Sequence, residues 1–104
     1  MMQILKNLFG SGTKLNAEEL LSKGAIILDV RTEREFKSAH VTGSINIPLD
    51  RLAKNISKLK KDKPIITCCA SGMRSATAKN ILKSNGFTEV YDGGSWSSIR
   101  SAIK

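Results

Sequence analysis

Two short runs of branched apolar residues constrain the fold of this chain more than any other feature of its sequence. Residues 25–30 read AIILDV and residues 65–68 read IITC, and neither run alternates between apolar and polar side chains. Continuous apolar runs of this length are typical of strands that are buried on both faces, as in parallel sheets. The sequence therefore predicts an α/β fold with helices on both faces of a sheet.

Helical patterns separate these strands. Asn16 and Glu19 have the spacing of a capping box at a helix start, as do Thr32 and Glu35, and Gly24 and Gly86 are typical helix stops. Further helices are predicted at residues 50–60, 75–85 and 95–103, further strands at 45–48 and 89–91, and a turn at 92–94. This alternation predicts a mostly parallel central sheet of about five short strands.

The length of 104 residues suits one compact domain, which we expect at residues 13–104, with residues 1–12 as an N-terminal extension. Residues 1–10 are expected to form a short amphipathic turn packed on the domain, or a frayed end. They lack the continuous apolar stretch of a secretory signal, and no run approaches the roughly 18 residues that span a bilayer. We therefore expect a cytoplasmic protein without a membrane partner.

The charge of the chain favours anionic partners. Seventeen Lys and Arg residues against nine Asp and Glu residues give a net charge of +8, which attracts anions. Nucleic acid is not an expected partner, because the one Trp, one Tyr and three Phe are scattered rather than interleaved with the basic residues. The densest basic stretch, residues 54–63, is interpreted as the solvated face of an amphipathic helix.

Two adjacent cysteines, Cys68 and Cys69, are the thiols of the chain, and His40 is its one histidine. Neighbouring cysteines cannot staple a fold, and structural zinc needs about four ligands, so we expect no metal site and a reducing compartment. Cys68 still belongs to the predicted strand, so its side chain is expected to point to the opposite sheet face from Cys69. We interpret Cys68 as a buried core residue.

The loop after the strand has the composition of an anion-binding turn. Ala70, Ser71 and Gly72 are small enough for a tight turn, and Gly72 can adopt a positive φ at little cost. Successive backbone N–H groups in such a turn, together with the positive end of the following helix, stabilise an anion. We therefore expect a lowered pKa for Cys69, and we expect Arg74 to bind a substrate oxyanion.

Several motifs occur in one order along most of the chain. They are Asp29-Val30-Arg31, Glu35-Phe36, residues 40–48 (HVTGSINIP), residues 69–75 (CASGMRS), Gly86-Phe87, Val90-Tyr91, and Gly93-Gly94 with Trp96. In this order they resemble the single-domain rhodanese family. One departure is that Trp96 lies closer to the glycine pair than in most members, so the rim of the pocket there is expected to differ.

The resemblance implies a sulfurtransferase that needs no metal or organic cofactor. Cys69 would be the catalytic nucleophile, taking sulfur from a small anionic donor such as thiosulfate as a persulfide and passing it to cyanide or to a thiol, either small or on a protein. The substrate-binding residues would be Ala70, Ser71, Gly72, Met73, Arg74 and Ser75. The resemblance leaves the oligomeric state open.

Four other features are assigned structural roles. Asp29 and Arg31 lie at the end of a central strand, where a buried ion pair between them would shape the site. His40 is expected to satisfy a hydrogen bond rather than to pair with the thiol. Gly93 and Gly94 are interpreted as turn residues, and Trp96 as part of the core.

Two other functions remain open from the residues alone. Counted from Cys68, the segment reads Cys-x5-Arg-Ser, the spacing of cysteine-dependent phosphatases, although no general acid is evident. A sulfur carrier or binding module without enzymatic activity would also fit the net charge. Replacing each cysteine separately distinguishes these functions, because sulfur transfer would depend on Cys69 and phosphatase activity would depend on Cys68.

Overall fold

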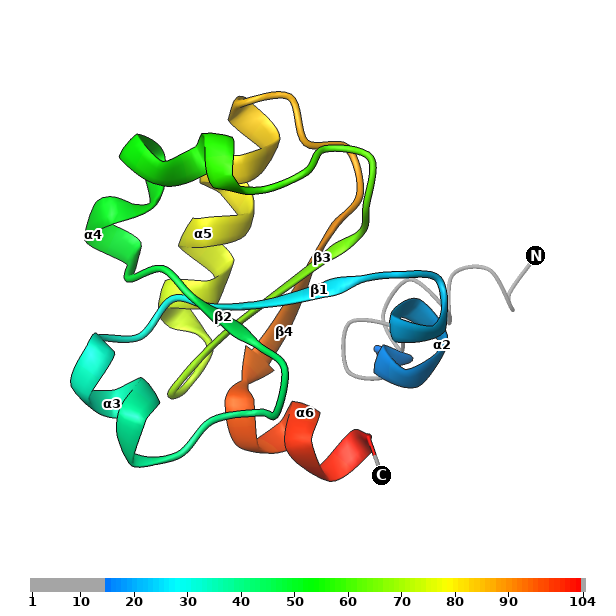
Figure 1. Ribbon diagram of the computed structural model, residues 1–104, viewed down its shortest axis with the longest axis vertical. Helices are drawn as coiled ribbons and strands as arrows, with labels where there is room; N and C mark the ends of the chain where they lie inside the picture. Colours follow the sequence, from blue (N-terminus) through cyan, green and yellow to red (C-terminus); the bar gives the residue numbers. More distant parts are fainter. Residues whose placement is uncertain (1–14, 104) are drawn as a thin grey trace, which may run out of the picture.

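Four parallel strands form one sheet in the computed structural model, which describes residues 15–103 (Figure 1). The strands are β1 (Ile26–Asp29), β2 (Ile45–Asn46), β3 (Ile65–Cys69) and β4 (Val90–Ser95), in the order β2-β1-β3-β4. The expected α/β class and parallel pairing are confirmed. The sheet has four strands within the described residues, slightly fewer than the expected number of about five.

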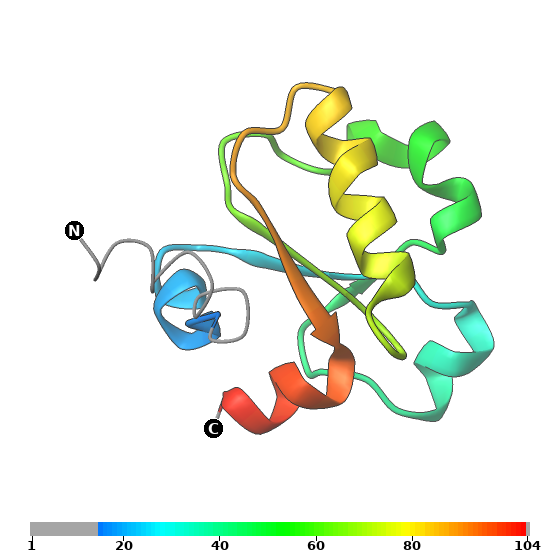
Figure 2. The same ribbon diagram turned by 180° about the vertical axis from the view of Figure 1, so that it is seen from behind.

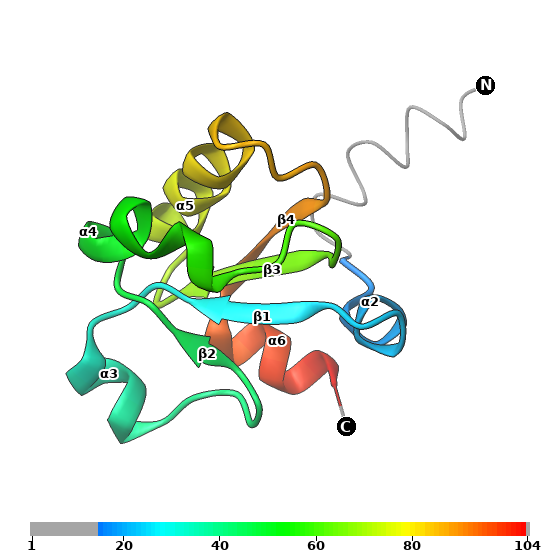
Figure 3. The ribbon, with the colours of Figure 1, turned by 45° about the horizontal axis from the view of Figure 1, so that its top comes forward.

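Helices cover both faces of the sheet (Figures 2 and 3). The helices are α2 (Ala17–Ser22), α3 (Glu33–Ser38), α4 (Leu49–Leu52), the 3-10 helix η1 (Ala53–Lys58), α5 (Met73–Ser84) and α6 (Trp96–Ala102). Leu52 of α4 and Leu82 of α5 pack with Leu28 on one face, and Ala17 of α2 and Ile99 of α6 pack with Ile27 on the other. The sheet thus separates two apolar clusters, as expected for strands that are buried on both sides.

Helix starts follow the predicted capping residues. The Thr32 side chain accepts a hydrogen bond from the Glu35 backbone N–H, and the Glu35 carboxylate accepts one from the Thr32 backbone, which confirms the capping box of α3. Asn16 caps α2 by accepting from the Glu19 backbone N–H at 3.0 Å. The Glu19 carboxylate accepts from the Asn16 side-chain amide, so this cap uses a different reciprocal contact from a standard box.

The helix predicted over residues 50–60 is shorter and broken. It consists of α4 followed by η1, with non-helical backbone angles at Asn55 (φ −114°, ψ 17°). The Asn55 side-chain amide donates to the Arg51 carbonyl at 2.8 Å, and such a local bond competes with regular helical bonding. The solvated-face interpretation holds, since Lys54 and Lys58 are exposed while Leu52 is buried.

The last strand extends beyond the predicted segment. The turn expected at residues 92–94 is wrong, because all three residues belong to β4, within which Gly94 adopts a positive φ of 75°. A Cβ atom at Gly93 would lie 2.7 Å from the Thr67 carbonyl oxygen and 2.5 Å from the Ile99 side chain. Glycine therefore serves here for close packing on β3 and α6 rather than for a turn.

The N-terminal extension predicted at residues 1–12, with its amphipathic turn, lies outside the described residues. Within residues 15–103, no helix is long and apolar enough to cross a membrane. Because the four strands are parallel, their carboxyl ends meet at one edge of the sheet. The loop that joins β3 to α5 leaves the sheet at this edge, which is where ligands bind in open α/β folds.

Candidate active site

The two cysteines at the end of β3 point to opposite faces of the sheet, as predicted. Cys69 lies in the cluster that contains Leu28 and Leu82, and Cys68 lies in the cluster that contains Ile27 and Ile99. Neither cysteine has exposed surface, and both are free thiols. A difference of one residue therefore places two chemically identical groups in separate environments.

The loop after Cys69 wraps around its sulfur atom. Gly72 has φ 112° and ψ −17°, a left-handed conformation that glycine adopts without the strain of a side chain. The Gly72 N–H donates to the Cys69 Sγ at 2.9 Å, and the Ser75 N–H donates to it at 3.3 Å. Since α5 begins at Met73, the Ser75 N–H belongs to the first turn of the helix, where backbone donors are otherwise unpaired.

These hydrogen bonds decide the acidity of Cys69. Burial alone would raise the pKa of this thiol, but the backbone N–H groups of Ser75, Gly72 and Ser71 and the Ser75 side chain outweigh burial, so its pKa is lowered. For Cys68, burial and the nearby Asp29 carboxylate raise the pKa to about 12. The thiolate, which is the nucleophilic form, therefore forms more readily at Cys69 than at Cys68.

The outer side of the loop is formed by exposed residues. Ala70 and Ser71 are exposed, and the Met73 side chain is 81% exposed even though it is large and apolar. These predicted substrate-binding residues therefore form the rim of the loop, whereas the buried Ser75 lies against the sulfur.

Arg74 faces a carboxylate rather than an open anion site. Its Nη1 and Nη2 atoms donate to Oε1 and Oε2 of Glu35 at 2.8 and 3.0 Å. The Arg74 side chain and the Thr32 backbone lower the pKa of Glu35 to about 2. The pair ties the start of α5 to α3. The capping-box spacing indicated Glu35, but its pairing with Arg74 was not predicted.

The buried ion pair expected between Asp29 and Arg31 is present. Arg31 Nη2 lies 2.7 Å from Asp29 Oδ2, and Nε contacts both carboxylate oxygens. Arg31 also donates to the Ala39 carbonyl and lies over the Trp96 ring. Asp29 is in register with Cys68, so the pair lies on the sheet face opposite Cys69. It therefore fixes the edge of the sheet beneath the loop instead of lining the thiol.

Asp92 is a residue of the site that the sequence analysis missed. Its Oδ1 atom accepts a 2.6 Å hydrogen bond from the Ser75 hydroxyl and a 3.0 Å bond from the Gly94 N–H. The only sequence signal was its position before the glycine pair, which was interpreted as a turn. Asp92 connects β4 to the loop that holds Cys69.

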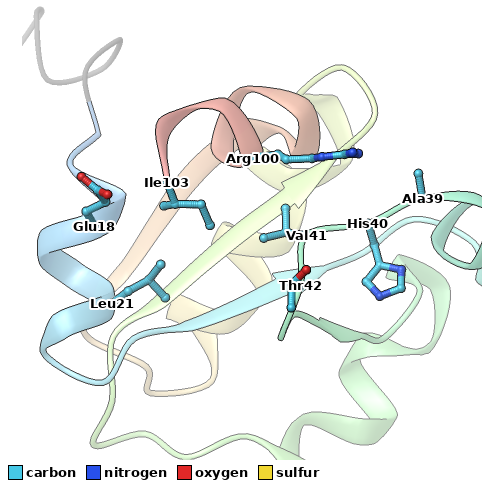
Figure 4. Close-up of a pocket in the computed structure, with 8 residues that line it drawn as sticks. All are labelled: Glu18, Leu21, Ala39, His40, Val41, Thr42, Arg100 and Ile103. Carbon is cyan, nitrogen blue, oxygen red and sulfur yellow. The ribbon is translucent and has the colours of Figure 1, made fainter.

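A pocket of about 670 Å³ lies elsewhere on the molecule, between α2, α6 and residues 39–42 (Figure 4). Its lining residues are Glu18, Leu21, Ala39, His40, Val41, Thr42, Arg100 and Ile103. His40 stacks on Phe36, and its Nδ1 atom lies 2.7 Å from the Phe36 carbonyl oxygen, which fits the structural role expected for it. The pocket is on the Cys68 side of the sheet, so it does not serve the Cys69 loop.

Comparisons with known proteins agree with this arrangement. Residues 13–101 match the family described as Rhodanese-like domain. The chain is 36% identical over 80 residues to the thiosulfate sulfurtransferase GlpE of Pseudomonas savastanoi, covering 75% of this chain and 76% of that protein. It is 38% identical over 68 residues to the uncharacterized protein YqhL of Bacillus subtilis, covering 65% of this chain and 54% of YqhL, about half of that relative's length.

A solved structure leads to the same family. The structure described as a rhodanese with anions from Escherichia coli is 32% identical, with a TM-score of 0.67, over 71% of this chain and 89% of that one. The match of residues 13–101 includes the thiol loop, all four strands and the edge at which they meet. This chain belongs to the rhodanese-like family.

Proposed function

We propose that this protein is a sulfurtransferase that moves sulfane sulfur from a donor such as thiosulfate to cyanide or a thiol, through a persulfide on Cys69. The observation that supports this most strongly is the Cys69 sulfur held by the N–H groups of Gly72 and Ser75. The likeness to a thiosulfate sulfurtransferase supports the choice of donor. No step needs a metal or an organic cofactor.

In the first half-reaction the Cys69 thiolate attacks the outer sulfur of thiosulfate. A sulfur–sulfur bond forms to Cys69 while the bond between the outer sulfur and the sulfonate breaks, and sulfite leaves with the electron pair. The enzyme then holds a persulfide anion whose charge is stabilised by the same preorganised donors, the N–H groups of residues 70–75. The chemistry is nucleophilic catalysis through a covalent intermediate.

In the second half-reaction the acceptor removes the outer sulfur. Cyanide attacks it and leaves as thiocyanate, or a thiolate attacks it and becomes a persulfide, and in both cases the bonding pair returns to Cys69 as a thiolate. The thiol has no exposed surface, and the exposed residues beside it in the loop, which donor and acceptor would meet first, are Ala70, Ser71 and Met73. The net charge of +8 supports anionic donors.

The structure gives no support to the alternative of a cysteine-dependent phosphatase with Cys68 as its nucleophile. Cys68 is on the opposite sheet face from the loop, and burial raises its pKa to about 12, so its thiolate is scarce at neutral pH. We also propose a cytoplasmic, reducing setting, which would keep the Cys69 thiol free to react.

The test is a thiocyanate assay with thiosulfate and cyanide on wild type, Cys69→Ser and Cys68→Ser. The proposal predicts activity for wild type and Cys68→Ser and only background for Cys69→Ser. An unchanged rate in Cys69→Ser would refute it. A protein that loads sulfur on Cys69 but passes it to neither cyanide nor a thiol would be a carrier rather than an enzyme.

A further inference from the structure

The cavity on the Cys68 side of the sheet has the size of a small-molecule site. Its volume is about 670 Å³, and small ligands bind in clefts of roughly 300–1,000 Å³. It lies between α2, α6 and residues 39–42 (Figure 4). None of its lining residues belongs to the thiol loop, so a ligand held here would be additional to the sulfur donor and acceptor.

One part of the lining is apolar. Leu21 of α2, Val41 and Ile103 come from three separate segments and line the cavity together. Val41 is buried, whereas Leu21 and Ile103 are half-buried and pack against the apolar cluster on this sheet face. Half-buried apolar side chains around a concave surface favour a ligand with an apolar portion, because binding removes both apolar surfaces from water.

The basic residue of the lining is Arg100 of α6. Its side chain is exposed, and its Cζ atom lies 5.3 Å from the centroid of the Trp96 ring. Such a contact restrains a long side chain and leaves the N–H donors of the guanidinium without acceptors. Within residues 15–103 no carboxylate forms an ion pair with Arg100. A guanidinium in this state binds a carboxylate through two parallel hydrogen bonds.

The acidic residue of the lining, Glu18, is on a different element from the guanidinium. Glu18 belongs to α2, and Figure 4 shows the Arg100 side chain extending away from that helix. His40 and Thr42 lie on the side of the cavity that is away from α2 (Figure 4). A negative charge in the cavity is therefore favoured near Arg100 and disfavoured near α2. The net charge of +8 also attracts anions to the molecule.

We propose that this cavity binds a small carboxylate with an apolar chain. The carboxylate pairs with Arg100, and the chain lies against the three apolar side chains of the lining. The site goes beyond the proposed function, since it involves neither Cys69 nor its loop. A neutral molecule with the same chain lacks the ion pair, and a short carboxylate lacks the apolar contact, so both should bind more weakly.

The test is an NMR titration of the full-length ¹⁵N-labelled protein with hexanoate. We expect saturable shifts of the backbone amide signals of Val41, Thr42 and Ile103, with a Kd of roughly 0.1–1 mM. The indole N–H signal of Trp96 should shift with them, and it is identified directly because the chain has one tryptophan. Shifts confined to residues 70–75 would place the anion in the thiol loop and overturn the proposal. So would the absence of saturation below about 10 mM.

Two ligand comparisons test the charge and the chain without any mutation. Hexanol has the same chain without the charge and should bind at least about fivefold more weakly than hexanoate, because charge-assisted hydrogen bonds are lost. From butanoate to hexanoate to octanoate the affinity should rise by about two- to fourfold for each added CH₂. Equal affinities of hexanoate and hexanol, or no dependence on chain length, would overturn the proposal.

Replacing the arginine assigns the effect to one side chain. Arg100→Met keeps a long side chain without the guanidinium, so the affinity for hexanoate should fall at least about fivefold while that for hexanol stays the same. Arg51→Met is the matched control, because Arg51 is an exposed arginine of α4, which packs on the other sheet face. It should leave both affinities unchanged. An equal loss of hexanoate affinity in both variants would mean attraction by net charge alone and would overturn the site.

Discussion

Cys68 and Cys69 are neighbours on one strand, and the structure gives them opposite chemistry. Both are fully buried, so burial does not distinguish them. Cys69 accepts hydrogen bonds from the backbone of the next loop, and its pKa is lowered. Cys68 lies on the other face beside Asp29, and burial raises its pKa to about 12. In this fold the acidity of a buried thiol follows from the direction of backbone N–H groups rather than from exposure.

The largest effect that separates the two cysteines is on sulfur transfer. Cys69→Ser should lower kcat/KM by at least roughly 10³-fold, because the nucleophile is lost. Cys68→Ala should keep most of the activity and lower the free energy of unfolding by about 1–2 kcal/mol, because a fully buried sulfur atom is removed. Thiocyanate assays and urea unfolding measure the two effects. The comparison fails if Cys68→Ala also abolishes transfer.

On the sheet face that carries Cys68 and Asp29, mutations should mainly change the free energy of unfolding. Arg31→Met leaves the Asp29 carboxylate buried without its partner, which should cost roughly 3–5 kcal/mol of unfolding free energy. Arg51→Met is the matched control, since it removes an exposed 3.5 Å contact with Glu33 and should change stability by less than about 1 kcal/mol. Urea unfolding compares the two. Equal losses in both variants would contradict the role of the buried pair.

The Cys69 face should respond through reactivity. Gly72→Ala places a side chain at φ 112°, which should lower the free energy of unfolding by roughly 1–2 kcal/mol. The change should also turn an N–H away from the sulfur. We therefore expect a higher midpoint for the pH dependence of Cys69 alkylation by iodoacetamide. Gly43→Ala is the matched control, because Gly43 has φ 85° and open space around its Cβ position. It should lose similar stability and leave the midpoint unchanged. A raised midpoint in both variants would indicate general loosening instead.

The smallest expected effect concerns the link between α3 and the loop. The pKa of Glu35 is lowered from 4.5 to about 2, so its pairing with Arg74 stabilises the fold above pH 4.5, and this contribution is lost as the pH falls through about 2. Because both side chains are about one third exposed, Glu35→Gln should cost only about 1 kcal/mol at pH 7.

Thermal unfolding of wild type and Glu35→Gln at pH 7 and at pH 2 tests this linkage. The difference between the two proteins should be present at pH 7 and largely gone at pH 2. Glu33→Gln serves as the control for an exposed carboxylate on the same helix. A difference that persists unchanged at pH 2 would show that Glu35 acts through its cap and not through its charge.

The features that the sequence predicted are local. The apolar runs of β1 and β3 and the capping box of Thr32 with Glu35 depend on residues close in sequence. The opposite faces of Cys68 and Cys69 follow from the two-residue period of a strand. These features were enough to locate the thiol loop.

The features that the sequence did not predict depend on which strands are neighbours. Asp92 reaches Ser75 because β4 pairs with β3, and Arg74 reaches Glu35 across 39 residues. No spacing rule encodes such contacts. The break at Asn55 was missed for another reason, since a side chain there competes with the helix backbone.

The most direct test of the account is intact mass after incubation with thiosulfate, for wild type, Cys69→Ser and Cys68→Ala. The account predicts a gain of one sulfur atom in wild type and in Cys68→Ala, removed by cyanide, and no gain in Cys69→Ser. A gain that persists in Cys69→Ser and disappears in Cys68→Ala would place the reactive sulfur on the other face of the sheet and contradict the account.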